Sequence, residues 1–266
     1  MINKSLYKYG IKKNWKLFAI FSAIITMYFV IIVTMFNPDF KNMLDQFSQF
    51  MPKLISAVGM MPINGTMEAF LSAYLYGFIM ILFPMLLTII LTNGLVVKHT
   101  EKGSAVFLLS APVKRKAIVI TQMLVLITFS IALIIFTTII GLISSSIFFP
   151  GQLHIGKFIL LNVGTLGLHL FIAGLCFLAS CIFNESRKSL MFGAGISVFM
   201  YVLQMVAQTG DKFSFAKYFT FFTMFNPNGI VILSVTSIIT MVILFVCAAA
   251  FFIASVFVYD KKDFHI

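Results

Sequence analysis

The polar side chains best placed for chemistry in this sequence lie inside long apolar runs. Among Asp, Glu, Lys, Arg and His, only His169 lies in the interior of such a run, and Asn162 precedes it by seven residues. That spacing places both side chains on one face of a helix. They would line a polar path for a substrate, or they would form interhelical hydrogen bonds that fix packing. Gln204 and Gln208, one helical turn apart, carry the same two interpretations.

The serines and cysteines of this sequence do not form a recognisable catalytic or metal-binding pattern. Three consecutive serines, 144–146, have no base or acid near them in the sequence, and a hydrolytic nucleophile needs such a partner. The three cysteines, Cys176, Cys181 and Cys247, lack the spacing of a CxxC pair or a Cys–His metal site. We therefore expect no catalytic residue and no metal in this chain, and we interpret the cysteines as small apolar packing residues.

The composition requires that helices in a membrane position these side chains. Of 266 residues, 61% are hydrophobic and 10% are charged, whereas soluble domains are usually about 25% charged. Six apolar runs approach or exceed the roughly 20 residues that a membrane-spanning helix needs. We predict an all-α polytopic membrane protein that forms a single transmembrane domain over residues 1–266. The six predicted spans are 17–36, 69–92, 117–149, 158–183, 189–208 and 230–259.

The basic residues predict the orientation of the spans. The net charge is +11, from 17 Lys and 2 Arg among others, but these charges lie between the apolar runs. They do not form the Arg-rich face of a nucleic-acid-binding protein, so we expect no nucleic-acid partner. With a cytoplasmic N-terminus, 14 of the 19 Lys and Arg lie inside and five outside. The positive-inside rule thus predicts cytoplasmic termini in a multi-pass protein. The preference for Lys over Arg and the abundance of Ile, Phe and Asn indicate an AT-rich bacterial genome, so we expect the protein in a bacterial cell membrane.

Three features depart from a simple up-and-down pattern of spans. Pro84 should kink the second span, because proline removes a helix hydrogen bond. The outer segment 37–68 is about half polar and is broken by Pro and Gly. Segment 209–229 is rich in Phe and Tyr and ends in Asn-Pro-Asn-Gly, a turn signal. We expect interfacial or re-entrant helices there, between the fifth and sixth spans.

The first 16 residues carry a regular stripe of lysines ahead of the first span. A spacing of four residues places these lysines on one side of a helix, and Trp15 lies next to the span. Such a helix would lie in the membrane interface, with the lysines reaching lipid phosphates. We predict an interfacial helix over residues 1–16. The stripe consists of Lys4, Lys8, Lys12 and Lys16.

The cytoplasmic loop 98–116, between the second and third spans, contains an apolar stretch at 105–109. A solvated loop has no use for such a stretch, so a partner is expected to cover it. Ser110 followed by Pro112 indicates the end of one helix and the start of another. The loop therefore predicts a short helix presented to a cytoplasmic partner.

The sequence motif of this loop resembles that of a known family. Glu-x-Gly followed by Leu-Leu-Ser-x-Pro-Val-x-Arg, before a long third span, resembles the permease subunit of type-2 ABC exporters. The motif covers about 15 residues, and the expected topology of nearly the whole chain is similar to that family. The matching residues are Glu101, Gly103, Leu108, Leu109, Ser110, Pro112, Val113 and Arg115.

The resemblance implies a set of partners. Two copies of a separate ATPase subunit would dock beneath the membrane and bind ATP and Mg there. A second permease chain, identical or related, would complete the transmembrane dimer. The part of loop 98–116 around Glu101–Pro112 would be the coupling helix, with Phe107 added to the matching residues at the contact. The chain has no GxxxxGK[ST] phosphate loop, so ATP hydrolysis is expected in the partner and this chain needs no cofactor of its own.

The apolar runs also indicate which energy sources a transport mechanism could use. They lack the buried carboxylates of ion-coupled transporters and the Arg ladder of voltage sensors. Energy would therefore enter from outside the membrane, and a path with almost no fixed charge would suit an amphipathic or hydrophobic cargo. Three alternatives stay open: a sensor or immunity protein that binds a peptide without transport, an intramembrane enzyme, and a passive channel.

Overall fold

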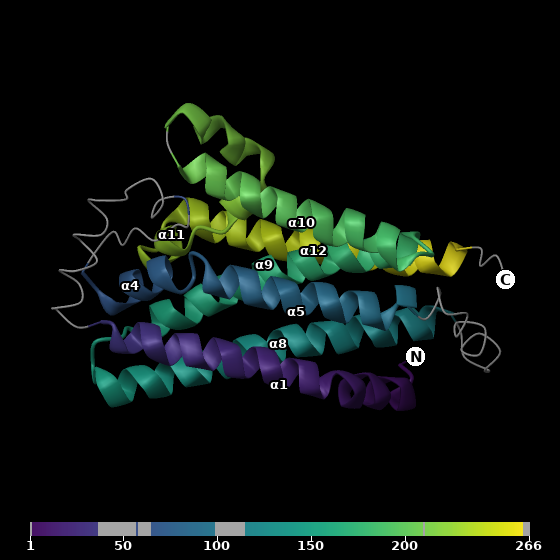
Figure 1. Cartoon of the computed structure of the whole chain (residues 1–266), viewed down its shortest axis with the longest axis horizontal. Helices are drawn as coiled ribbons and strands as arrows, with labels where there is room; N and C mark the ends of the chain where they lie inside the picture. The colour runs from purple at the N-terminus through teal and green to yellow at the C-terminus, as the bar shows by residue number, and fades with distance from the viewer. Residues whose placement is uncertain (1, 37–56, 58–64, 99–114, 210, 263–266) are drawn as a thin grey trace.

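The computed structural model describes residues 2–36, 57, 65–98, 115–209 and 211–262. Helices dominate these residues, and no strand occurs among them. Long helices run side by side along one axis, and short helices gather at one end (Figure 1). The helices are α1 (Lys4–Thr34), α4 (Met67–Tyr74), α5 (Ile79–Leu95), α8 (Arg115–Phe148), α9 (Ile155–Ile182), α10 (Ser186–Gln208), the 3₁₀ helices η1 (Asp211–Phe219) and η2 (Phe221–Met224), α11 (Pro227–Val231) and α12 (Val235–Lys261).

Five of the described helices are long and apolar enough to cross a membrane, and a bent pair of helices makes a sixth span if it is counted as one. The five are α1, α8, α9, α10 and α12, and the pair is α4 with α5. Their bounds follow the apolar runs to within a few residues, except at the N-terminus. The prediction of an all-helical fold is thereby confirmed for the described residues, and five or six of the helices have the length and apolar composition that a membrane span needs.

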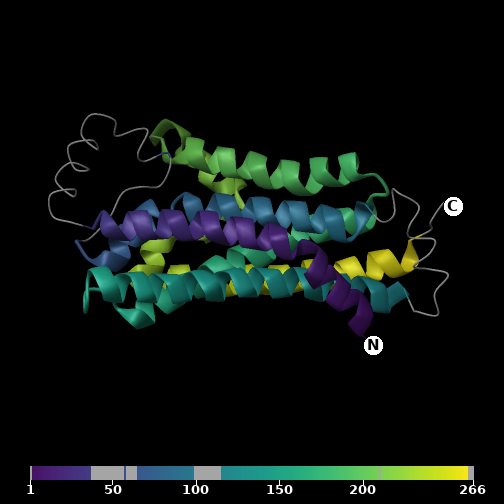
Figure 2. The same cartoon turned by 60° about the horizontal axis from the view of Figure 1, so that its bottom comes forward.

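The N-terminal helix differs from the prediction. α1 passes through Lys16 without interruption, so the expected interfacial helix and first span form one helix of 31 residues. At about 1.5 Å per residue this helix is about 46 Å long, well beyond a hydrocarbon core of about 30 Å. No Pro lies near Trp15, and the Asn14 side chain donates to the Gly10 oxygen of its own helix at 2.9 Å instead of capping a new one. Figure 2 shows the first turns bending away from the line of the remaining helix.

The helix predicted as the second span is broken, but the break does not lie at Pro84 as predicted. α4 and α5 meet at an angle of 48° across residues 75–78, whereas the helix continues through Pro84. Tyr76, within the break, is fully buried, and its hydroxyl donates to Asn162 Oδ1 of α9 at 2.9 Å. A bond from another helix thus holds the break, and no single residue of segment 69–92 would have revealed it.

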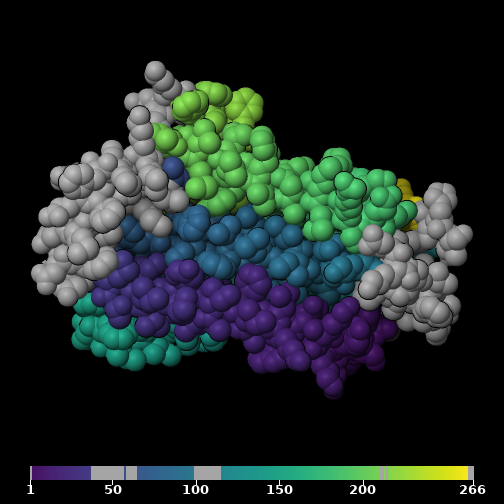
Figure 3. Space-filling view, viewed as in Figure 1, coloured from purple at the N-terminus to yellow at the C-terminus, as the bar shows by residue number. Residues whose placement is uncertain are grey.

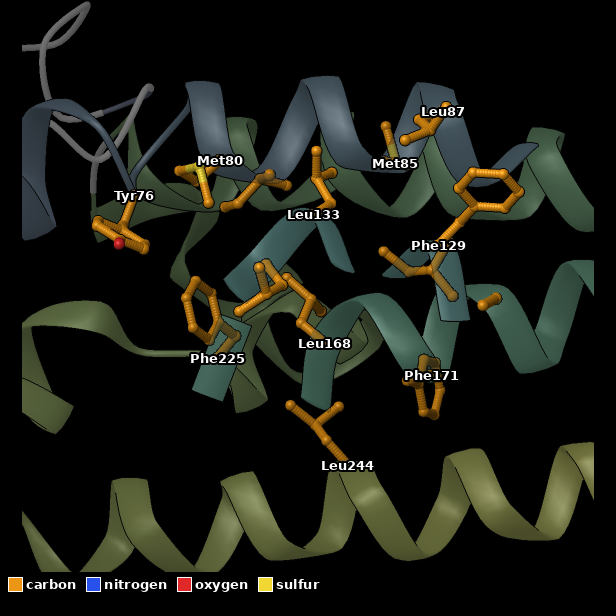
Figure 4. Packing of buried hydrophobic residues seen from close by; sticks show 14 of the residues in the cluster. Tyr76, Met80, Met85, Leu87, Phe129, Leu133, Leu168, Phe171, Phe225 and Leu244 are labelled. Carbon is orange, nitrogen blue, oxygen red and sulfur yellow. The ribbon is translucent and has the colours of Figure 1, made fainter. Parts of the chain in front are cut away.

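α9 forms the centre of the bundle and has the largest buried share of the five long helices. Its Gly174 lets α12 approach closely: a Cβ at this glycine would lie 3.1 Å from the Ala248 backbone oxygen. Small residues serve the same purpose at many helix contacts in membranes. In Figure 4, Leu168 of α9 lies between Met80 of α5 and Leu244 of α12. On the face shown in Figure 3, α1, α5 and α10 form three adjacent bands.

The connection between α10 and α12 consists of short helices, as the aromatic segment 209–229 predicted. η1 packs along the end of α10, and the Thr220 hydroxyl donates to the Met200 oxygen at 3.0 Å. Met200 lies eight residues before the end of α10 at Gln208, which corresponds to about 12 Å along a helix. The chain therefore turns back along α10 before α11 leads into α12. Most of the predicted outer segment 37–68 lies outside the described residues.

Candidate functional site

The ends of several helices converge at one end of the bundle. The first turns of α1 and α8 and the last turns of α5 and α12 meet there (Figure 1). We call it the lysine-rich end. Among the basic residues whose side chains the structure describes, only Lys157 and Lys217 belong to the opposite end. The exposed basic residues of the lysine-rich end are Lys4, Lys8, Lys12, Lys13, Lys16, Lys98, Arg115, Lys116, Arg187, Lys188 and Lys261.

The predicted coupling loop connects α5 to α8 at this end. Of its predicted contact residues, only Arg115 is described, as the first residue of α8. The other predicted contact residues lie outside the described residues: Glu101, Gly103, Phe107, Leu108, Leu109, Ser110, Pro112 and Val113.

Two bonds join the start of α8 to the end of α12. An Arg115 guanidinium nitrogen donates to the Lys262 backbone oxygen at 3.1 Å. The Lys116 ammonium lies 3.3 Å from Asp260 Oδ2. Both bonds involve exposed groups, and exposed ion pairs are worth about 0–1 kcal/mol. They contribute little to stability, but they fix the first residues of α8, which follow the loop, against the end of α12.

A third bond extends this link to α9. The Lys262 ammonium donates to the Phe183 oxygen, at the C-terminal end of α9, at 2.8 Å. The last turn of a helix leaves carbonyl oxygens without partners, so a cation is well placed there. The ends of α8, α12 and α9 are therefore held together directly after the loop. No local pattern in the sequence indicates this arrangement, since Lys262 has the features of an ordinary basic flank.

Lys262 yields a prediction on pH. Burial lowers its pKa from 10.5 to about 8, and a smaller effect of Cys181 acts in the opposite direction. The neutral amine is the form that attacks acylating reagents, so half of Lys262 should be reactive near pH 8. We expect its acetylation rate, followed by peptide mass spectrometry, to reach half its maximum near pH 8. A half-maximum above pH 10 would contradict the assigned environment.

The lysine stripe on α1 is exposed, as expected, and so is Trp15. The opposite face of the same turns is packed against α8. The Asn3 backbone N–H donates to Thr121 Oγ1 at 3.0 Å, and the hydroxyls of Tyr7 and Thr128 are 2.9 Å apart. The first turns of α1 therefore follow α8, the helix that begins where the loop ends.

His169 is fixed by the second span. Its Nε2 lies 2.7 Å from the Met80 oxygen, and a carbonyl oxygen only accepts, so Nε2 carries the proton. Pro84, four residues after Met80, has no N–H to donate to that oxygen. The imidazole therefore replaces the helix hydrogen bond that proline removes. Asn162 accepts from Tyr76 and donates to the Phe158 oxygen at 2.9 Å. These contacts favour the packing interpretation for both residues.

The remaining candidate residues lie in different parts of the structure and make different contacts. Gln204 lies at the opposite end of the bundle, where its side chain bonds Thr223 and lines a pocket. Ser144 and Ser146 donate to backbone oxygens of their own helix. All three cysteines are free thiols. The described part of the chain contains no group of three or more His, Cys, Asp or Glu residues that could hold a metal ion.

No protein-family model matches this sequence, and no curated protein shows significant similarity to it. The resemblance carried by loop 98–116 therefore stays a prediction from the motif itself.

Proposed function

We propose that this chain is the membrane-spanning permease subunit of an ATP-driven ABC exporter. A separate ATPase subunit, in two copies, would dock at the lysine-rich end, and a second permease chain, identical or related, would complete the transmembrane dimer. The observation that carries the proposal is the position of the α5–α8 connection. It carries the exporter-like motif and leads into a start of α8 that is bonded to the end of α12, which is in turn bonded to the end of α9.

This arrangement suits a coupling device. Movement of the loop would act first on Arg115 and Lys116, which begin α8. Their bonds to the end of α12 would carry the displacement to the last span as a rigid-body shift. The lysine-rich end would face the cytoplasm of a bacterial cell, in accordance with the positive-inside rule. The mechanism would then be alternating access driven by ATP in the partner.

The proposed cargo is amphipathic or hydrophobic: a peptide, an antimicrobial compound or a lipid-like molecule. Apart from Lys16 of α1, the described long helices contain no Asp, Glu, Lys or Arg in their middle turns. The polar groups His169 and Asn162 are engaged within the protein. A path through such a bundle would offer apolar contacts and hydroxyls rather than fixed charges.

The test is recovery of an ATPase subunit from a mild-detergent pull-down of the tagged protein. We expect mass spectrometry to find an ATPase with the wild type and to lose it with Leu108→Asp, because a charge cannot enter an apolar docking groove. Leu108→Met keeps an apolar side chain of similar volume and should retain the ATPase. No ATPase with any of the three proteins would refute the exporter and favour the sensor or the enzyme.

A further inference from the structure

A pocket of about 380 Å³ lies at the end of the bundle opposite to the lysine-rich end. The break in the second span, the last turns of α10 and the η2–α11 connection form its walls, and Figure 1 shows α4 and α11 at that end. Pockets that bind small molecules have volumes of about 300–1,000 Å³. The size alone makes a bound ligand feasible, and the chemistry of the walls indicates which kind.

Hydrogen bonds between different elements hold the walls of this pocket in place. The Ser72 hydroxyl of α4 donates to Asn228 Oδ1 of α11. The Asn226 side chain accepts from the Gly229 backbone N–H at 3.0 Å, which caps the first turn of α11. A Cβ at Gly229 would collide with the Ser237 side chain, so α11 packs tightly on the start of α12. These bonds hold the α4 and α11 part of the wall in place, and Lys217 of η1 and Ala57 complete the lining.

One buried hydroxyl in the wall has no partner among the described residues. Tyr201 of α10 lines the pocket and is only 5% exposed, yet its hydroxyl makes no hydrogen bond there. Its ring is held between Phe78 and Phe222, with centroid distances of 6.4 and 5.2 Å. An unsatisfied buried hydroxyl costs about 1–3 kcal/mol. The hydroxyl itself is closed to solvent in this structure, so a ligand in the pocket would accept this O–H, and remove the cost, only after a small turn of the ring toward the cavity.

The other polar groups of the wall add donors and one positive charge. Lys217 lines the pocket, and its ammonium makes no ion pair or hydrogen bond with the described residues. The Asn226 side chain uses its oxygen to accept from Gly229, and its amide nitrogen makes no hydrogen bond with another described residue. Gln208 adds an amide that can donate. The described lining contains no Asp or Glu. This excess of donors around a cation matches a group of oxygen acceptors with negative charge.

Thr223 adds one constraint on the same wall. Its hydroxyl lies 2.7 Å from the Lys217 backbone oxygen and 2.9 Å from the Gln204 amide. The Gln204 atom at this distance is Oε1, an acceptor, so the single hydroxyl hydrogen goes to one of two oxygens, and the shorter distance favours the Lys217 carbonyl. The Thr223–Lys217 bond fixes the backbone that carries the lysine.

Part of the pocket lining and the surface next to the pocket are apolar. Ile81, Met205, Phe222 and Phe225 form the apolar part of the lining. On η1, next to the end of α10, Phe213, Phe215, Tyr218 and Phe219 are at least half exposed. Aromatic side chains of this kind are concentrated at the headgroup level of membranes. With these aromatic side chains at the headgroup level, the pocket would lie where a phospholipid headgroup meets its acyl chains.

We propose that this pocket binds the headgroup of an anionic phospholipid from the leaflet at that end. Lys217 and the Tyr201 hydroxyl bind the phosphate oxygens, the amides of Gln208 and Asn226 bind the hydroxyls of a glycerol headgroup, and the acyl chains lie against the exposed aromatic residues of η1. The site requires neither an ATPase partner nor transport, so it stands independently of the proposed function.

The experiment measures lipid binding to the purified full chain in detergent by native mass spectrometry. Phosphatidylglycerol is the probe, and phosphatidylcholine, which carries the same phosphate without net charge, is the comparison. A photoreactive phosphatidylglycerol maps the site, and we expect crosslinks within residues 201–228. Tyr201→Phe and Lys217→Gln should each weaken the affinity of this site about tenfold, because each removes one bond to a charged group.

The controls separate this site from the lysine-rich end, which also attracts anionic lipids. Lys157→Gln, in the first turn of α9 at the same end as the pocket, should leave the affinity within about twofold of the wild type. Tyr201→Phe keeps the ring, so its packing is preserved. Equal binding of phosphatidylcholine, unchanged affinity in both pocket variants, or displacement of the lipid by an equal concentration of free glycerol phosphate would each overturn the proposal.

Discussion

Replacing His169 with leucine is expected to lower the free energy of unfolding by about 2 kcal/mol, but much less when Pro84 is replaced by alanine at the same time. The imidazole Nε2–H bonds the Met80 oxygen at 2.7 Å, and Pro84 cannot provide the usual backbone donor for that oxygen. In the Pro84→Ala variant the helix offers its own N–H at this position. The side chain of His169 then loses its role as a substitute.

The magnitude follows from two opposing observations about hydrogen bonds in membranes. Interhelical bonds contribute only about 0.6 kcal/mol on average, because separated helices find other partners. The Met80 oxygen is different, since proline denies it the local donor that would satisfy it in a separate helix. We therefore expect a coupling energy between His169 and Pro84 near the upper limit for such bonds, about 1.5 kcal/mol.

The measurement is a double-mutant cycle from thermal or denaturant unfolding in detergent. It uses the wild type, His169→Leu, Pro84→Ala and the double variant. His169→Gln is the control, because its amide offers a donor at a similar distance and should recover part of the lost stability. Additive effects of the two substitutions would show that the Met80 oxygen does not depend on the imidazole.

The sequence predicted the parts of this fold that depend on composition. Apolar runs of about 20 or more residues leave few alternatives to helices, and the observed helices follow those runs. The bend in the second span was assigned to Pro84, but it lies at residues 75–78. Tyr76 stabilises the break through a bond to α9, and a contact between residues 86 positions apart leaves no local pattern.

In the candidate site, too, local features could be predicted from the sequence, whereas long-range contacts could not. The lysine stripe and the position of loop 98–116 between two spans could be predicted from local spacing. The bonds from Arg115 and Lys116 to the end of α12 join residues about 145 positions apart, so only the folded chain reveals them. Gln204 was paired with Gln208 by spacing, but its partner Thr223 and the pocket depend on how the η1–η2 connection turns back. The motif in the loop, the ATPase and the cargo stay predictions.

Substitution of two glycines of α10, Gly193 and Gly195, is expected to change the stability of the protein in opposite directions. A Cβ at Gly193 would lie 2.9 Å from the Cys176 Cα and 3.3 Å from the Ala179 Cβ, both on α9. The first of these atoms belongs to the backbone of the central helix and has little freedom to move. Two residues later, a Cβ at Gly195 would lie no closer than 3.8 Å to its nearest neighbour, an oxygen of its own helix. The pair therefore separates packing from helix propensity.

Alanine favours a helix over glycine by about 0.8–1 kcal/mol at either position. Gly195→Ala should gain most of that amount. Gly193→Ala should lose about 1–2 kcal/mol net, because overpacking costs about 1–3 kcal/mol and exceeds the gain in propensity. Gly193→Leu should abolish the folded form, whereas Gly195→Leu places an apolar side chain on an exposed face and should be tolerated. Unfolding transitions in detergent measure these differences.

The lipid pocket supplies an independent readout of the same packing. Separating α10 from α9 would move Tyr201, which lies two turns beyond Gly193 on α10. Gly193→Ala should therefore weaken binding of phosphatidylglycerol as well as stability, while Gly195→Ala should preserve both. Equal stability of the two alanine variants would mean that α10 can shift away from α9 at little cost. In that case the contact at Cys176 would not be what holds α10 against the centre of the bundle.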